Sequence, residues 1–104
     1  MAKVTQDLSG QWEFREYPIS VRRMRDLDDR HWQKARVPSS VFTSLAEAGQ
    51  IDERQLNSNP ENFDWVSEKP WVYRRRFEVS EEMLARDRII LVFEGLDTVA
   101  KIWL

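Results

Sequence analysis

Two short segments near the start of the chain have the hydrophobic pattern of β-strands. In residues 11–15, Trp12 and Phe14 fall on one side of an extended backbone, and polar or charged side chains fall on the other. The apolar members of the second segment, residues 31–37, are Trp32, Ala35 and Val37. Pro38 ends this second strand, because proline has no amide hydrogen to donate to a ladder.

The strongest alternation of the chain predicts a third strand over residues 71–79. One face carries Trp71, Tyr73, Arg75, Phe77 and Val79. The opposite face carries Val72, Arg74, Arg76 and Glu78. This period of two is typical of a strand with one buried and one exposed face, and Arg75 is the charged interruption of the apolar face.

The end of the chain predicts two further strands. The continuous apolar run of residues 88–94 suits a strand that is buried on both faces. Residues 95–97 predict a turn, and residues 98–104 begin another strand. Natural sheets avoid a bare apolar edge, and the chain stops at Leu104 in the middle of this strand. We therefore expect residues 1–104 to be an incomplete domain.

One short helix is predicted between the second and third strands, over about residues 40–48. Ser40 can accept a hydrogen bond from the first turn, and Gly49 stands where a left-handed C-terminal cap belongs. The apolar face expected for this helix consists of Val41, Leu45 and Ala48. Further along, Ser80 is followed by two glutamates, which predicts a capped turn.

Two stretches carry no periodic pattern. Residues 51–70 are predicted to be a long connection without regular structure, and such connections are usually functional or disordered. Phe63 and Trp65 argue against disorder there, because large aromatic side chains favour packing. Residues 17–30 are also irregular and end in a run of charges of both signs, which predicts a solvated surface.

Composition excludes several classes of function. Hydrophobic residues make up 41% of the chain and charged residues 33%, which is the balance of a globular protein. The net charge of −2 argues against nucleic acid as a partner, and the absence of cysteine excludes disulfides and thiolate chemistry. The sequence has no run of about 18 apolar residues, so no membrane partner is predicted. A polar N-terminus without a signal-peptide pattern predicts a soluble, cytoplasmic protein.

Candidate chemistry is sparse in this chain. Its five tryptophans have two competing interpretations, burial in a core and stacking on the faces of sugars. His31 is the only histidine, and it has neither a serine or cysteine dyad partner nor a metal-ligand spacing, so we expect a structural or surface role. The adjacent carboxylates at 28–29 and 81–82 are expected to be solvated. We therefore predict no catalytic residue, no metal site and no cofactor.

Several segments resemble, in the same order, the motifs of the N-terminal sugar-binding-like domain of family 2 glycoside hydrolases. They are residues 8–14 (LSGQWEF), 37–45 (VPSSVFTSL), 49–52 (GQID), 59–67 (NPENFDWVS), 71–74 (WVYR) and 93–102 (FEGLDTVAKI). Ser39 replaces the glycine that is usual in the second motif, and residues 53–54 depart from the third. The spacing between the WV pair and the WxY strand is most like the β-mannosidase branch of the family.

This resemblance implies an all-β fold, a jelly-roll or galactose-binding-domain-like β-sandwich, of which residues 1–104 would supply the N-terminal part. It also implies a parent enzyme that removes terminal non-reducing β-D-mannose residues with retention of configuration. Retention uses two carboxylates about 5 Å apart. In the family these are glutamates of a (β/α)₈ barrel that would follow this chain. The chain alone is therefore expected to be non-catalytic.

The family's front domain helps to shape the pocket for the terminal sugar, which makes Asn59, Asn62 and Trp65 the candidate substrate-binding residues for a β-mannoside. Amide groups can donate to and accept from sugar hydroxyls, and an indole face suits the apolar side of a pyranose. The alternative is that the two asparagines hold the loop backbone while Trp65 packs in the core.

Two hypotheses of other classes remain open at this stage. One is a free-standing carbohydrate-binding module that uses exposed tryptophans. The other is an oligomerisation domain, in which an exposed strand edge pairs with another copy to give a homo-oligomer.

Overall fold

The computed structural model describes residues 4–18, 20–52, 54–55, 59–95 and 101–104. The chain divides into two compact units, which are described separately below. The larger unit is Asp7–Phe77, and the smaller combines Met1–Gln6 with Glu78–Leu104. No helix in the described part of the chain is long and apolar enough to cross a membrane.

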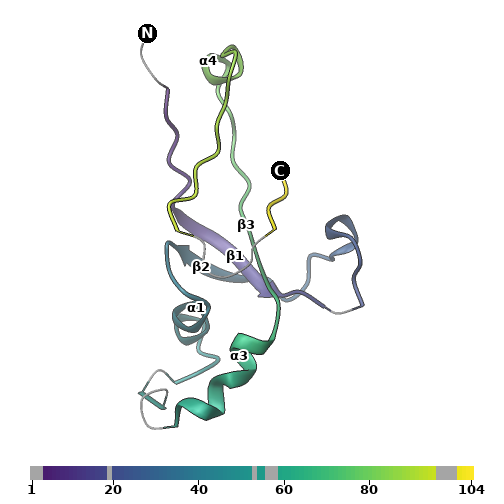
Figure 1. Cartoon of the computed structure of the whole chain (residues 1–104), viewed down its shortest axis with the longest axis vertical. Helices are drawn as coiled ribbons and strands as arrows, with labels where there is room; N and C mark the ends of the chain where they lie inside the picture. The colour runs from purple at the N-terminus through teal and green to yellow at the C-terminus, as the bar shows by residue number, and fades with distance from the viewer. Residues whose placement is uncertain (1–3, 19, 53, 56–58, 96–100) are drawn as a thin grey trace. The chain divides into compact units, whose positions relative to one another are not determined.

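The larger unit is built on a three-stranded antiparallel sheet with the order β2-β1-β3. The strands are β1 (Gly10–Glu16), β2 (Gln33–Val37) and β3 (Trp71–Arg74). The central strand is thus the first in sequence, with its two partners on either side (Figure 1). All three strands lie where the alternation of side chains predicts them.

One face of this sheet is apolar because of how the strands pair. Phe14 lies opposite Gln33 on β2 and opposite Tyr73 on β3, so these residues share a face. The ring of Phe14 stacks on that of Tyr73 with 5.5 Å between centroids, and it lies 6.1 Å from the ring of Trp71. Phe14 is 1% exposed, which makes it the centre of the core.

The predicted helix is α1 (Val41–Glu47), and its caps are those expected. The hydroxyl of Ser40 accepts a hydrogen bond from the Thr43 amide at 3.1 Å. At the other end Gly49 has φ of +76°, and the Gln50 amide donates to the Leu45 carbonyl at 2.9 Å. This left-handed turn ends the helix and places Gln50 beside Leu45.

The buried face of α1 differs from the predicted one. Ser44 and Leu45 are its buried residues, whereas Ala48 is exposed. The reason is that the helix ends at Glu47, so Ala48 is the C-cap and turns away from the core. Leu45 joins Phe14 in one buried cluster.

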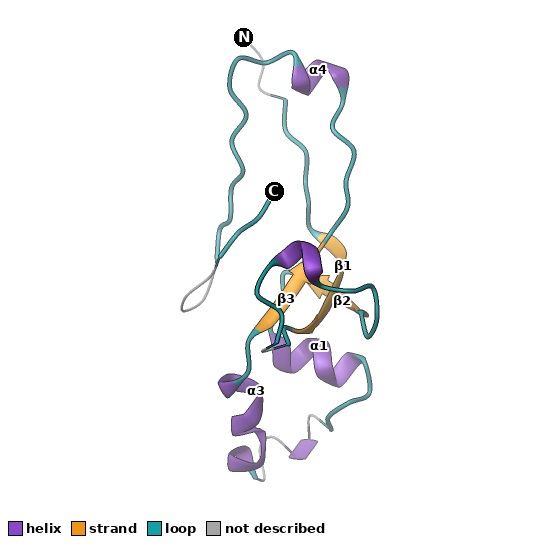
Figure 2. Ribbon diagram, turned by 90° about the vertical axis from the view of Figure 1, so that its right-hand side faces the viewer, coloured by secondary structure: helices purple, strands orange, loops and turns teal. Residues whose placement is uncertain are grey.

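The connection at 51–70 contains regular structure, so the prediction of an irregular loop is wrong over its second half. A 3-10 turn, η2 (Pro60–Phe63), leads directly into a short helix, α3 (Asp64–Glu68). Phe63 and Val66, three residues apart, are both buried on one side of it. The Trp71 indole donates to the Val66 carbonyl at 2.7 Å and so occupies an acceptor left open at the end of the helix. Helices α1 and α3 lie on the same side of the sheet (Figure 2).

The third strand is shorter than predicted. The alternation runs to Val79, but β3 ends at Arg74, where its ladder with β1 reaches Glu13. Arg75 follows, and its guanidinium donates to the carbonyls of Leu8 and Ser9 at 2.6 and 2.7 Å. These carbonyls are therefore bonded by a side chain in place of a strand, which explains the charge on the otherwise apolar face.

The opposite face of the sheet is held by charges and one indole. The Arg74 guanidinium lies 3.8 Å from the centroid of the Trp32 ring and also bonds to Glu13 and Asp29 at 3.1 and 2.8 Å. Arg15 donates to Asp28 at 2.6 Å. The charged run that ends at residue 30 is therefore only partly a solvated surface. It contains the 3-10 turn η1 (Met24–Asp26), and two of its aspartates, Asp28 and Asp29, bond to arginines of the sheet.

The smaller unit contains a short helix, α4 (Glu81–Leu84), capped by the Ser80 hydroxyl, which accepts from the Met83 amide at 3.1 Å. The capped turn predicted there is confirmed. The predicted buried strand over residues 88–94 is not confirmed, because this segment forms no strand and is exposed. A strand needs a ladder partner, and no described residue supplies one to this segment. Of the strand predicted over 98–104, only 101–104 lie within the described residues, and these form no strand.

A hydroxyl network links α1 to β3, and it leads us to expect that the stability of the larger unit depends on pH. The buried Ser44 hydroxyl lies 3.2 Å from that of Tyr73 and 3.3 Å from that of Ser39. Burial raises the pKa of Tyr73 above its ordinary value of 10.0, and the hydrogen bond with Ser44 offsets this only in part.

The sign of this effect follows from linkage. The pKa of Tyr73 is higher in the folded than in the unfolded state. Its contribution to the free energy of unfolding is therefore fully present below pH about 10 and is lost as the pH rises through the folded-state pKa. Urea unfolding at a series of pH values should show the wild-type chain losing stability more steeply than Tyr73→Phe above pH about 10. Parallel curves for the two proteins would contradict the prediction.

Candidate functional site

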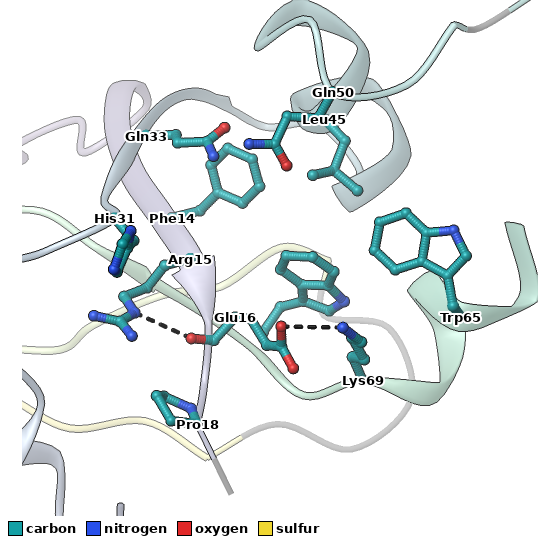
Figure 3. Close-up of a pocket in the computed structure, with 11 residues that line it drawn as sticks. Phe14, Arg15, Glu16, Pro18, His31, Gln33, Leu45, Gln50, Trp65 and Lys69 are labelled. Carbon is teal, nitrogen blue, oxygen red and sulfur yellow. Dashed lines mark hydrogen bonds and ion pairs between the residues drawn. The ribbon is translucent and has the colours of Figure 1, made fainter.

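A cavity of about 470 Å³ opens on the larger unit, and side chains from all three strands, α1 and α3 line it (Figure 3). Its apolar lining comes from Phe14, Pro18, Leu45, Trp65 and Trp71. Its polar lining comes from Arg15, Glu16, His31, Gln33, Gln50 and Lys69. A concave site with an aromatic wall and a few polar groups is the usual form of a small-molecule site.

Two indoles from different elements form the aromatic wall. Trp65 projects from α3 and Trp71 from β3, and their ring centroids are 6.3 Å apart at an interplanar angle of 51°. Trp71 is held by its hydrogen bond to Val66 and by the Phe14 ring. Trp65 is 37% exposed, so much of its ring remains open to solvent. The wall therefore pairs one fixed indole with one accessible indole.

An ion pair stands beside the two indoles. The Lys69 ammonium lies 3.2 Å from a carboxylate oxygen of Glu16 and 5.4 Å from the centroid of the Trp65 ring. Lys69 follows the end of α3 and Glu16 ends β1, so this contact ties the helix to the sheet. Both side chains are more than a third exposed, and such pairs contribute little to stability. Their effect is to place one charge of each sign at the pocket.

Arg15 is fixed more firmly than the other charged groups of the pocket. It donates to Asp28 at 2.6 Å, to the Arg30 carbonyl at 2.7 Å and, through Nε, to the Glu16 carbonyl at 3.1 Å. The hydrogen bond from Arg15, with a second one from the Arg30 amide, lowers the pKa of the Asp28 carboxyl. Arg15 thus keeps a charged partner outside the pocket.

Gln33 carries a hydrogen-bond acceptor that has no described partner. Its Oε1 is buried and accepts no hydrogen bond from any described residue. Leaving a buried acceptor unpaired costs about 1–3 kcal/mol, so such an atom in a native structure calls for an explanation. Figure 3 shows its carboxamide and that of Gln50 facing each other across the ring of Phe14. A hydroxyl group or a water molecule in the cavity could donate to this oxygen.

The structure separates the three predicted substrate-binding residues. Trp65 lines the cavity, but Asn59 and Asn62 do not. Both asparagines are exposed, Asn62 within η2 and Asn59 as its N-cap residue, and the Asn62 amide donates to the Asn59 carbonyl at 3.1 Å. No hydrogen bond joins either side chain to a described residue, and the alternative in which these side chains hold the loop stays a prediction. Nor does Trp65 pack wholly in the core, since it is partly exposed.

Sequence reasoning missed the two glutamines. Gln33 enters the site because β2 pairs with β1 in the register that sets it opposite Phe14, and no local pattern specifies a register. Gln50 enters through the left-handed turn at Gly49, a signal that the sequence does carry. His31 also lines the cavity, as an exposed residue with φ of +65°, which agrees with the predicted surface role. No group of three or more potential metal ligands occurs among the described residues.

Three curated proteins illustrate what the chain is similar to. It is 41% identical to β-mannosidase B of Emericella nidulans over 66 residues, which are 64% of this chain and 8% of that protein. It is 34% identical to β-mannosidase B of Aspergillus niger over 94 residues, 86% of this chain and 11% of that protein. It is 32% identical to β-mannosidase of Mus musculus over 68 residues, 65% of this chain and 8% of that protein. The chain thus spans about a tenth of the length of these relatives.

No solved structure shows a significant match to the chain. The sequence profile described as glycosyl hydrolase 2 galactose-binding domain-like matches residues 12–104, which is most of the chain. This match confirms the fold class and the resemblance drawn from the motifs. The chain therefore belongs to the galactose-binding domain-like family of glycosyl hydrolase 2.

Proposed function

We propose that this chain is a non-catalytic domain of a retaining, β-mannosidase-like glycosidase, and that its cavity helps to hold the terminal β-D-mannose residue of the substrate. The observation that carries the proposal is the pairing of an open indole, Trp65, with an unpaired buried acceptor, the Oε1 atom of Gln33. Both line one cavity. The relatives that are named β-mannosidases supply the choice of sugar.

The chemistry of the cavity suits a pyranose. One side of a pyranose ring presents C–H groups, which can pack on an exposed indole such as Trp65. The hydroxyl groups at its rim can donate to Gln33 and accept from Gln50 or Lys69. A hydroxyl donor at Gln33 would remove the penalty of its unpaired oxygen, and this gain favours a polyhydroxylated ligand over an apolar one.

The same cavity lacks the groups that hydrolysis requires. Glycoside hydrolysis commonly uses two carboxylates, about 5–5.5 Å apart in retaining enzymes. Among the described residues that line the cavity, Glu16 is the one carboxylate, and it is paired with Lys69. The catalytic carboxylates of our proposal therefore belong to the rest of the parent protein. The free-standing carbohydrate-binding module has no support in the comparisons.

Asn59 and Asn62 keep a role in this proposal, outside the cavity. Both are exposed, Asn59 at the N-cap of η2 and Asn62 within it, and η2 leads directly into the helix that carries Trp65. Their amide groups have no described partner and so remain available to further hydroxyl groups of the substrate. Asn59 and Asn62 would contact the substrate in the complete enzyme.

A titration of intrinsic tryptophan fluorescence tests the proposal. Methyl β-D-mannoside added to the 104-residue chain should give a saturable change of emission at millimolar sugar. Trp65→Ala should weaken the apparent affinity about tenfold, because it removes the apolar surface that the sugar covers. The matched control is Trp103→Ala, which removes an exposed indole that does not line the cavity. A flat titration, or equal affinities for wild type and Trp65→Ala, would contradict the proposal.

A further inference from the structure

His31 is the one described residue other than glycine whose backbone lies in the left-handed region. Its φ is +65°, and it comes two residues before β2, where its side chain lines the cavity. Residues with a Cβ atom rarely adopt this conformation, because it brings the Cβ atom close to a carbonyl oxygen. A strained residue persists only where its surroundings hold it firmly, and such residues cluster at functional sites.

The residue before His31 is held at both of its backbone groups. The Arg30 amide donates to the Asp28 carboxylate at 3.1 Å, and the Arg30 carbonyl accepts from the Arg15 guanidinium at 2.7 Å. The same guanidinium bonds to the Asp28 carboxylate at 2.6 Å. The Arg15 side chain is only 9% exposed, so this anchor belongs to the packed part of the larger unit. The backbone on the N-terminal side of His31 is therefore fixed to β1.

The residue after His31 is held as well. The Trp32 indole donates to the Asp28 carbonyl at 2.9 Å, and its ring lies 3.8 Å from the Arg74 guanidinium of β3. Arg74 also bonds to Asp29 at 2.8 Å, which fastens the same segment a second time. We call Arg15, Asp28, Trp32 and Arg74 the Trp32 clamp. The clamp fixes both neighbours of His31 and so maintains its left-handed conformation.

The imidazole itself takes no part in this clamp. No hydrogen bond or ion pair joins the His31 side chain to a described residue. Glycine would adopt the same backbone conformation without strain. The fold thus maintains a strained backbone at His31 without using the side chain that causes the strain. What the clamp achieves is to hold an imidazole at the wall of the cavity.

We propose that His31 contacts the substrate and sets the affinity of the cavity for it, by hydrogen bonding to a hydroxyl group of the bound β-mannoside. This inference rests on the proposed function. In its neutral form an imidazole offers one donor and one acceptor, which matches a hydroxyl group, itself both donor and acceptor. Gln33 lines the same cavity two residues further along, so the two side chains can bind neighbouring hydroxyl groups (Figure 3).

A pair of substitutions separates sugar binding from backbone strain. His31→Gly and His31→Ala both remove the imidazole, so each should weaken the binding of methyl β-D-mannoside about fivefold, measured by tryptophan emission. The two variants differ in the backbone, because glycine relieves the strain and alanine keeps it. The urea midpoint of His31→Gly should therefore exceed that of His31→Ala by about 0.5 M. A merely structural histidine would not give weaker binding in the variant with the higher midpoint.

Proton NMR detects the contact directly. His31 is the only histidine of the chain, so its imidazole Cε1–H proton gives a single, unambiguous resonance. Methyl β-D-mannoside should shift this resonance saturably, with the same apparent Kd as the change of tryptophan emission. In the Trp65→Ala variant the same shift should require about tenfold more sugar, because both side chains line one cavity.

The outcomes distinguish this inference from the proposed function. If wild type binds the sugar and His31→Gly binds it equally well, the role of His31 is overturned while the proposed function stands. A His31 resonance that does not move at saturating sugar has the same meaning. Equal urea midpoints for His31→Gly and His31→Ala would overturn the strained backbone. Absence of sugar binding by wild type overturns the proposed function and this inference together.

Discussion

Replacement of Phe14 with alanine is expected to lower the free energy of unfolding of the larger unit by about 3–5 kcal/mol. Phe14 lies on the central strand, is 1% exposed and contacts the rings of both Trp71 and Tyr73. Its removal takes away the transfer energy of a large ring, the aromatic contacts and the packing of the atoms that surround the void. A loss of this size approaches the whole stability of a small domain.

Urea unfolding followed by tryptophan emission measures this change. The matched control is Gln11→Ala on the same strand, where an exposed side chain is removed and a change within about 0.5 kcal/mol is expected. Phe14→Leu should fall between the two, because it keeps apolar volume and loses the aromatic contacts. A loss below about 1.5 kcal/mol for Phe14→Ala would show that the sheet does not pack around this ring.

Leu45→Ala is expected to cost about 2–5 kcal/mol for the same unit. Leu45 is 1% exposed and joins α1 to the core cluster that contains Phe14 and Val66. Alanine is the best helix former, so the substitution does not weaken the helix itself, and the loss reports the removed apolar contacts and the void they leave in the core. Leu45 also lines the pocket, so the same variant should weaken any sugar binding.

The chain provides a closely matched control for this prediction. Leu84 is another helical leucine, the last residue of α4, but it is 63% exposed. Leu84→Ala removes the same atoms and should change stability by less than about 0.5 kcal/mol. Equal losses at the two leucines would mean that α1 does not cover the sheet. Leu45→Met, which keeps the volume, should cost less than about 1.5 kcal/mol.

Local patterns predicted the strands and the first helix because the physics of these elements is local. The alternation around Phe14 reflects one buried face, and the caps at Ser40 and Gly49 satisfy backbone groups within a few residues. The short helix α3 escaped prediction because five residues carry less than two turns of periodicity. Its formation depends on the burial of Val66 against the sheet, which is a tertiary effect.

The pocket was predictable only in part, for a related reason. Trp65 was selected from its motif, and the structure places it in the cavity. Gln33 reaches the same cavity through strand register, and Lys69 reaches it through an ion pair with a residue 53 positions away. Long-range pairings of this kind leave no local periodicity. Residues 88–94 show the converse case, since their composition favours a strand but no described ladder partner is present to form one.

The order of the strands has a consequence for how the chain folds. The central strand is made first, and one of its cross-strand contacts, between Glu13 and Arg74, joins residues 61 positions apart. Closing so long a loop is entropically unfavourable and raises the contact order, which slows folding. During synthesis, β1 must wait until the residues between Glu16 and Trp71, and then β3 itself, have emerged before its second edge is covered. Until then that edge is open to mispairing, so the nascent chain is most vulnerable to aggregation at this stage.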